Sequence, residues 1–155
     1  MSNNLYIVRH GKMLIENRNK PDYLHLSKEG LDFALYLDNY FKDIYFDHIL
    51  YMSIDVKTSD PYDRCRSTIR GTKGVKSEFD KTQLSKMFDD INKADNNGRQ
   101  NILLCYRTEA FNVISNILDV EDNDEFFNKD YNRIFHFSFS NNNYSFVKKV
   151  NTEEK

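Results

Sequence analysis

Short apolar runs alternate with segments of helical periodicity along this chain, and this alternation constrains its fold more than any other feature. Two apolar runs, at 5–8 and 102–105, are typical of strands buried on both faces. A further extended region covers 49–53 and 56–59, which the sequence allows to be one bent strand or two short ones. Residues 134–140 alternate, and a return over 144–150 after three Asn residues has the pattern of a β-hairpin.

Helix signals lie between these runs. Ser27 is a good N-cap for a helix over about 28–43. Asp60 followed by Pro61 predicts the start of another helix, which we expect to end at Gly71 and Gly74. A weaker pattern predicts a helix over about 80–93, and Thr108 is expected to cap the last one. The expected apolar faces of the first and last helices are Leu31, Ala34, Leu35, Leu37 and Phe41, and Phe111, Ile114 and Leu118.

This order of elements predicts an α/β fold, a three-layer α/β/α sandwich with a mostly parallel central sheet and a C-terminal β-hairpin. The length of 155 residues fits one domain over 1–150, followed by a short polar tail at 151–155.

Composition narrows the possible partners. The formal net charge of −2 argues against nucleic-acid binding through bulk basic charge. No apolar run approaches the length that crosses a membrane, and the first residues do not resemble a signal peptide. The two cysteines, Cys65 and Cys105, form no disulfide framework, so we expect a cytoplasmic protein. We expect neither a cofactor nor a metal, and the sequence carries no signal for an oligomeric state.

Cationic and imidazole side chains stand at three expected strand-to-helix junctions, at Arg9-His10, Arg64 and Tyr106-Arg107. Ligands of open α/β sheets bind beyond the carboxyl ends of the strands, so these groups are expected to converge on one crevice. Guanidinium groups match phosphate oxygens in pairs, and helix N-termini add backbone donors. The pattern therefore predicts a site for a compact anion, with phosphate as the natural candidate.

Three segments resemble the histidine phosphatase superfamily, also called phosphoglycerate mutase-like. Residues 5–11, LYIVRHG, resemble its first strand with the Arg-His-Gly signature. Residues 26–30, LSKEG, are similar to its Leu-Thr-x-x-Gly helix start. Residues 59–68, SDPYDRCRST, resemble its Ser-Ser-Pro-x-x-Arg-Ala-x-Gln-Thr segment without a gap. The resemblance covers roughly residues 4–150.

The resemblance implies a phosphohydrolase whose nucleophile is His10, which forms a phosphohistidine that water later hydrolyses. Arg9 and Arg64 match the two arginines that clamp the phosphoryl group, and Arg107 and Gly11 are expected to contact the substrate. Asn17, with Lys12 and Arg18, could line the mouth of the pocket, although a solvated loop is the default interpretation. The expected substrate is a small phosphorylated molecule or a phosphoprotein.

Two departures from the family's pattern leave an alternative open. Arg107 falls where the family has a second histidine, and an arginine cannot exchange a proton near neutral pH. Lys86 stands where the family's general acid is expected, and Glu78, Asp80, Asp89 and Asp90 are nearby substitutes among which the sequence does not decide. An enzyme without this acid would favour acyl phosphates or phosphohistidine, whose leaving groups are good. The alternative is an inactive pseudophosphatase that binds a phosphorylated ligand or a partner protein.

Overall fold

The computed structural model describes residues 3–11, 26–52, 64–80, 82–93, 100–107, 110–118, 131–140 and 143–152. In chain order these residues form β1 (Asn3–Arg9), α1 (Lys28–Tyr40), β2 (Tyr45–Met52), α2 (Arg64–Thr68), β3 (Lys73–Phe79), α3 (Leu84–Lys93), β4 (Asn101–Tyr106), α4 (Phe111–Leu118), β5 (Arg133–Ser140) and β6 (Asn143–Asn151).

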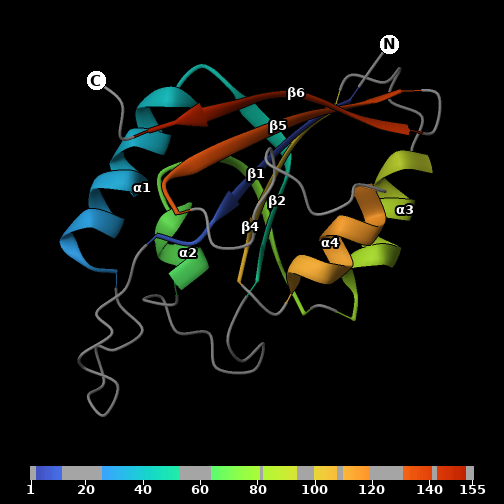
Figure 1. Cartoon of the computed structure of the whole chain (residues 1–155), viewed down its shortest axis with the longest axis horizontal. Coiled ribbons are helices and arrows are strands. Elements are labelled where there is room, and N and C mark those ends of the chain that lie inside the picture. The colour runs from blue at the N-terminus through green and yellow to red at the C-terminus, as the bar shows by residue number, and fades with distance from the viewer. Residues whose placement is uncertain are drawn as a thin grey trace.

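One sheet of order β3-β2-β4-β1-β5-β6 runs through the centre of the molecule. Strands β3, β2, β4 and β1 are mutually parallel, whereas β5 runs antiparallel to β1 and forms a hairpin with β6. Helices α1 and α2 lie on one side of the sheet and α3 and α4 on the other (Figure 1). The predicted three-layer sandwich with a mostly parallel sheet and a C-terminal hairpin is therefore confirmed.

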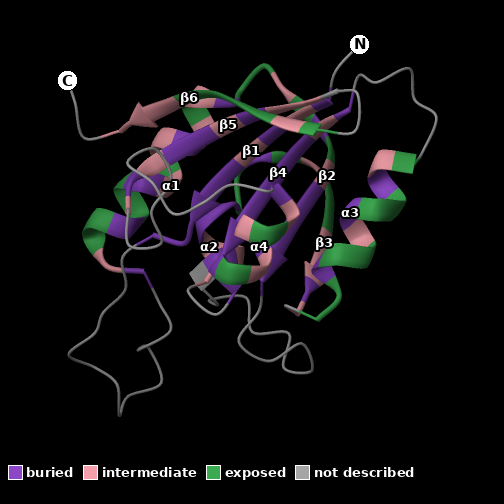
Figure 2. Cartoon of the chain, turned by 45° about the vertical axis from the view of Figure 1, so that its right-hand side comes forward, coloured by how far each residue is buried: buried purple, intermediate pink, exposed green. Residues whose placement is uncertain are grey.

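The two innermost strands, β1 and β4, explain why the parallel sheet is stable. Both read as apolar runs because both of their faces are covered by helices, and Ile7, Leu103 and Leu104 are fully buried. Figure 2 shows the central strands in the colour of buried residues, while the outer faces of α1 and α3 are exposed. The parallel pairing of β1 with β4 continues to Arg9 and Tyr106, so the carboxyl ends of the two strands are held side by side.

Helix α1 begins where the sequence predicted, since the Ser27 hydroxyl accepts a hydrogen bond from the Gly30 amide at 3.2 Å. The predicted apolar face was partly wrong. Leu31 and Leu35 are 52% and 65% exposed, and the helix instead buries Gly30, Phe33 and Leu37. The reason is the close approach of Gly30 to the backbone of Gly11, which sets the rotation of the helix about its axis.

The region after β2 departs most from the sequence-based prediction. Strand β2 spans Tyr45–Met52, earlier than expected, and residues 56–59 and the Asp60-Pro61 helix start lie outside the described residues. Helix α2 ends at Thr68 rather than at the glycines, and Gly74 lies in a strand, β3, that the sequence did not predict. Strand β3 is an edge strand whose residues are mostly exposed or half-buried, so it lacks the apolar pattern that reveals an inner strand.

The remaining elements agree with their patterns. Helix α3 begins at Leu84, within the expected span, and α4 buries the predicted Phe111, Ile114 and Leu118. The hairpin forms with β5 and β6 close to the expected bounds. Among the helices that the structure describes, none has the length and apolar character needed to cross a membrane.

Candidate active site at the ends of β1 and β4

Two of the predicted site residues, His10 and Arg107, come directly after the neighbouring parallel strands β1 and β4. Arg9 pairs with Tyr106 in the β1–β4 register, and the His10 amide donates to the Tyr106 carbonyl at 3.1 Å. His10 and Arg107, each one residue further along, therefore lie beside each other at the carboxyl edge of the sheet. The prediction that these junctions converge holds for this pair.

His10 is buried, with 1% of its surface exposed, and its ring is held by its own chain. The ring Nδ1 lies 2.8 Å from the carbonyl oxygen of Gly11. A carbonyl can only accept, so Nδ1 carries the proton and donates it to this bond. In the neutral ring the unshared pair is then on Nε2, which is the form of imidazole that can act as a nucleophile.

Gly11 connects the end of β1 to both helices on one side of the sheet. Its amide donates to the Thr68 hydroxyl of α2 at 2.8 Å, and Thr68 is fully buried. A Cβ atom on Gly11 would lie 2.9 Å from the Cα and the carbonyl oxygen of Gly30 in α1. The signature glycine is therefore required by a contact between two backbones. Thr68 was not singled out from the sequence, although it is the last residue of the matching 59–68 segment.

Arg9 is the last residue of β1 and is buried, with 8% of its surface exposed. Its guanidinium carbon lies 4.1 Å from the centre of the Tyr131 ring, within range of a cation–π interaction. The same ring meets His10, with centroids 5.7 Å apart and planes at 70°. Tyr131 belongs to no motif in the sequence, and only the antiparallel return of β5 brings it to this place.

The structure describes less of the remaining predicted site residues. Arg64 is the first residue of α2, one helical turn before Thr68, and its side chain lies outside what the structure describes. Asn17, Lys12 and Arg18 also lie outside the described residues. For the described part of the chain, no three His, Cys, Asp or Glu side chains gather as metal ligands.

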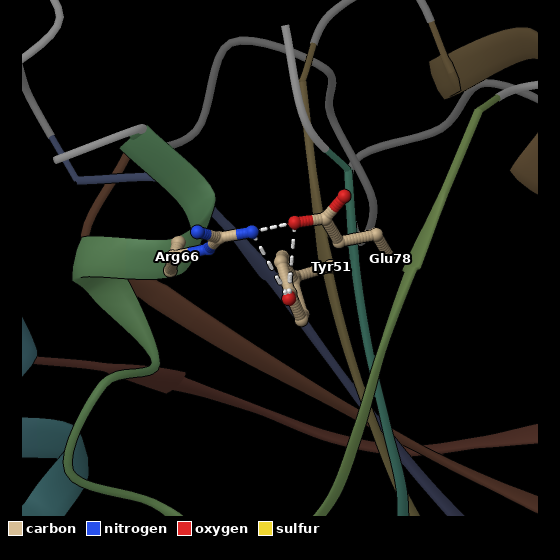
Figure 3. A network of polar contacts seen from close by, with 3 residues as sticks. All are labelled: Tyr51, Arg66 and Glu78. Atoms are coloured by element: carbon tan, nitrogen blue, oxygen red, sulfur yellow. Dashed lines mark hydrogen bonds and ion pairs between the residues drawn. The ribbon is translucent and has the colours of Figure 1, made fainter. Parts of the chain in front are cut away.

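Glu78 is one of the four acids that the sequence left open, and it belongs to a separate polar network (Figure 3). It forms an ion pair with Arg66 of α2 and accepts a hydrogen bond from the Tyr51 hydroxyl at 3.3 Å. Arg66 also donates to the Tyr51 hydroxyl at 3.4 Å. Strand β3 is separated from β1 by β2 and β4, three strand spacings or about 14 Å. Glu78 thus ties α2 to β2 and β3 rather than contacting His10.

The other candidate acids are no better placed. Asp80 accepts hydrogen bonds from the side chain and the amide of Thr82, which lower the pKa of its carboxyl, the opposite of what a proton donor needs. Asp90 pairs with the exposed Lys86 at 3.2 Å on α3. Asp89 lies on α3 at a cavity of about 590 Å³ between α3, α4 and the hairpin. That cavity is lined by Phe88, Asn92, Leu118 and Tyr144 among others, and none of the described residues that line it is a His or an Arg.

We compared the chain with known proteins in sequence and in structure. The sequence matches no family profile and no curated protein. In structure, the chain is similar to the protein histidine phosphatase SixA complexed with tungstate, with a TM-score of 0.67, 15% identity and coverage of 96% of this chain and 97% of that one. It is also similar to the alpha-ribazole phosphatase from Shigella flexneri, with a TM-score of 0.64, 12% identity and 96% of both chains covered.

A third similar structure is a phosphoglycerate mutase from Bacillus anthracis, with a TM-score of 0.60 and 14% identity over 95% of this chain and 92% of that one. All three are members of the histidine phosphatase superfamily. The chain therefore has the fold of this superfamily over nearly its whole length.

Proposed function

We propose that this chain, which has the histidine phosphatase fold, is a phosphohydrolase that works through a phosphohistidine on His10. The observation that carries this proposal is the bond from His10 Nδ1 to the Gly11 carbonyl. It fixes the tautomer with the unshared pair on Nε2 and holds the ring at the carboxyl end of β1. A histidine that merely filled space at a strand end would not need this orientation.

The reaction would proceed in two displacements. Nε2 of His10 attacks the phosphorus of the substrate, the P–N bond forms, and the bond to the leaving oxygen or nitrogen breaks. Water then attacks the phosphohistidine, releasing inorganic phosphate and restoring the neutral ring. Most of the catalysis of phosphoryl transfer is positioning and stabilisation of charge. Arg9, Arg64 and Arg107 would supply that charge, and Asn17 would line the entrance.

The residue beside His10 limits which substrates such an enzyme can use. Arg107 follows β4 where the family's second histidine is expected, and a guanidinium binds a phosphoryl oxygen but does not deliver a proton. Support for this comes from the four candidate acids: Glu78 and Asp90 form ion pairs, hydrogen bonds lower the pKa of the Asp80 carboxyl, and Asp89 lines a cavity whose described residues include no His or Arg. We therefore propose substrates whose leaving group needs little protonation, which are acyl phosphates or phosphohistidine in a small molecule or a protein.

A turnover assay tests this proposal. Purified protein is given acetyl phosphate and p-nitrophenyl phosphate, beside His10→Ala and the control His48→Gln. His48 is a useful control because it lies within β2 and pairs with Gln100 at 3.0 Å, away from the site. We expect turnover that is lost in His10→Ala and kept in His48→Gln. Equal rates in all three proteins would contradict the proposed catalysis and would leave anion binding as the function of the site.

A further inference from the structure

Tyr131 is the residue of the site for which the sequence offers no motif. It lies two residues before the start of β5, which runs antiparallel to β1 with Ile7 opposite Phe135. The start of β5 therefore lies beside the end of β1. In this position one aromatic ring contacts both Arg9, at 4.1 Å, and His10, at 5.7 Å between centroids.

The turn that carries Tyr131 is held from several directions. Asn132 has a φ of 60°, in the left-handed region that Asn tolerates better than most residues. Its side-chain amide donates to the Glu29 carboxylate in the first turn of α1 at 3.0 Å. Its carbonyl accepts from the Thr152 amide at 3.1 Å and from the Thr152 hydroxyl at 2.8 Å. The backbone that directly follows Tyr131 is thus tied to α1 and to the end of β6.

The geometry of a guanidinium explains what such a ring can do. All N–H donors of an arginine lie in the plane of the group, so a ring over its face occupies no donor. The ring restricts rotation of the group without covering the edge that carries the N–H donors, which is the edge that pairs with phosphoryl oxygens. A buried cation over an aromatic face is also more strongly stabilised than an exposed one.

We propose that Tyr131 is a positioning residue, which orients the Arg9 guanidinium through the face of its ring for binding a phosphoryl group. This inference rests on the proposed function, because it assigns Tyr131 a role at the same site. The ring acts through Arg9 and does not itself bind the substrate.

The test compares Tyr131→Leu with Tyr131→Phe, using acetyl phosphate turnover and calorimetric binding of inorganic phosphate. Loss of the ring should raise both KM and the phosphate Kd about tenfold, with a smaller effect on kcat. Tyr131→Phe keeps the ring and should restore both values to within about threefold of the wild type. The matched control is Tyr45→Leu, at a tyrosine that is 63% exposed at the start of β2, and it should behave as the wild type.

A second variant keeps the test decisive if Tyr131→Leu does not fold. Glu29→Ala removes the anchor of the Asn132 turn at an exposed residue, and we expect a rise of about threefold in the phosphate Kd. Folding of each variant is checked by circular dichroism and thermal unfolding.

The outcomes separate this inference from the proposed function. A folded Tyr131→Leu with the phosphate Kd of the wild type overturns the inference, whatever His10→Ala does. Equal losses in Tyr131→Phe and Tyr131→Leu also overturn it, because the hydroxyl would then be responsible. A wild type without His10-dependent turnover overturns the proposed function, yet a weaker phosphate Kd in Tyr131→Leu would still support the role of the ring. A wild type that binds no phosphate overturns both.

Discussion

At the scale of single residues, the site depends on a backbone contact as much as on side chains. The Gly11 carbonyl accepts the proton of His10 Nδ1, and the same residue lies against Gly30 with no space for a Cβ atom. Any displacement of Gly11 therefore moves the group that orients the histidine.

Gly11→Ala tests this coupling. The added methyl meets backbone atoms at 2.9 Å, which cannot rotate away, so β1 and α1 must separate. We expect a loss of about 1–3 kcal/mol in unfolding free energy from overpacking. We also expect a fall of about 100-fold in kcat, since a misplacement of about 1 Å at a reacting group has effects of this size. Urea unfolding and acetyl phosphate turnover measure the two; a stable variant with the wild-type kcat would show that Gly11 does not hold His10.

His10 could be predicted from the sequence, and Tyr131 could not. His10 stands in a tripeptide at the end of an apolar run, a local pattern that a single sequence displays. Tyr131 reaches Arg9 only because β5 returns antiparallel to β1, a pairing between residues far apart in the chain. The ion pair of Glu78 with Arg66 was also out of reach, because it joins residues of two different elements, β3 and α2.

At the scale of elements, the short helix α2 links the site to the rest of the sheet. Its Thr68 accepts from the Gly11 amide at 2.8 Å on one side, while Arg66 joins Glu78 and Tyr51 on the other (Figure 3). Five residues make too short a helix to be stable alone, so these contacts hold α2 in place.

Thr68→Val breaks one of these links without changing the shape of the side chain. The Gly11 amide would lose its acceptor in a fully buried position, at a cost of about 1–3 kcal/mol in unfolding free energy. Turnover should fall as well, because Gly11 orients His10. Thr68→Ser keeps the oxygen and serves as the control, with turnover closer to the wild type. Equal turnover in Thr68→Val and Thr68→Ser would show that the hydrogen bond to the Gly11 amide does not orient His10.

The elements that could be predicted are those with regular apolar patterns. Strands β1 and β4, helix α4 and the hairpin all show such patterns. Strand β3 did not, because an edge strand has no second neighbour and few buried residues. The face of α1 was misjudged at Leu31 and Leu35, since the contact of Gly30 with Gly11 outweighed the apolar pattern.

At the scale of the whole molecule, one histidine links sheet stability to pH. His136 of β5 stacks on Tyr6 of β1 with centroids 4.3 Å apart, and its Nε2 donates to the Asn4 side-chain oxygen at 3.0 Å. Burial, followed by the charge of Lys148, lowers the pKa of His136. The unfolded chain therefore binds more protons than the folded one between that lowered pKa and the ordinary value of about 6.5. The contribution of His136 to stability is present above this range and is lost as the pH falls through it.

His136→Gln should flatten this dependence. Urea unfolding at pH 7.5, 6.5 and 5.5 should show the wild type losing more stability on acidification than the variant, because a glutamine side chain does not take up a proton. Because the two proteins differ only at position 136, the contributions of all other groups cancel in the comparison. Parallel curves for the two proteins would mean that His136 has the same pKa in the folded and the unfolded chain.

The central claim concerns a covalent intermediate, and trapping it tests the claim most directly. The protein is mixed with acetyl phosphate, quenched in alkali, where phosphohistidine survives, and digested for mass spectrometry. We predict one added phosphoryl group on the peptide that contains His10, absent from His10→Ala and present in His48→Gln. A phosphoryl group on another residue, or the same labelling in His10→Ala, would contradict the account.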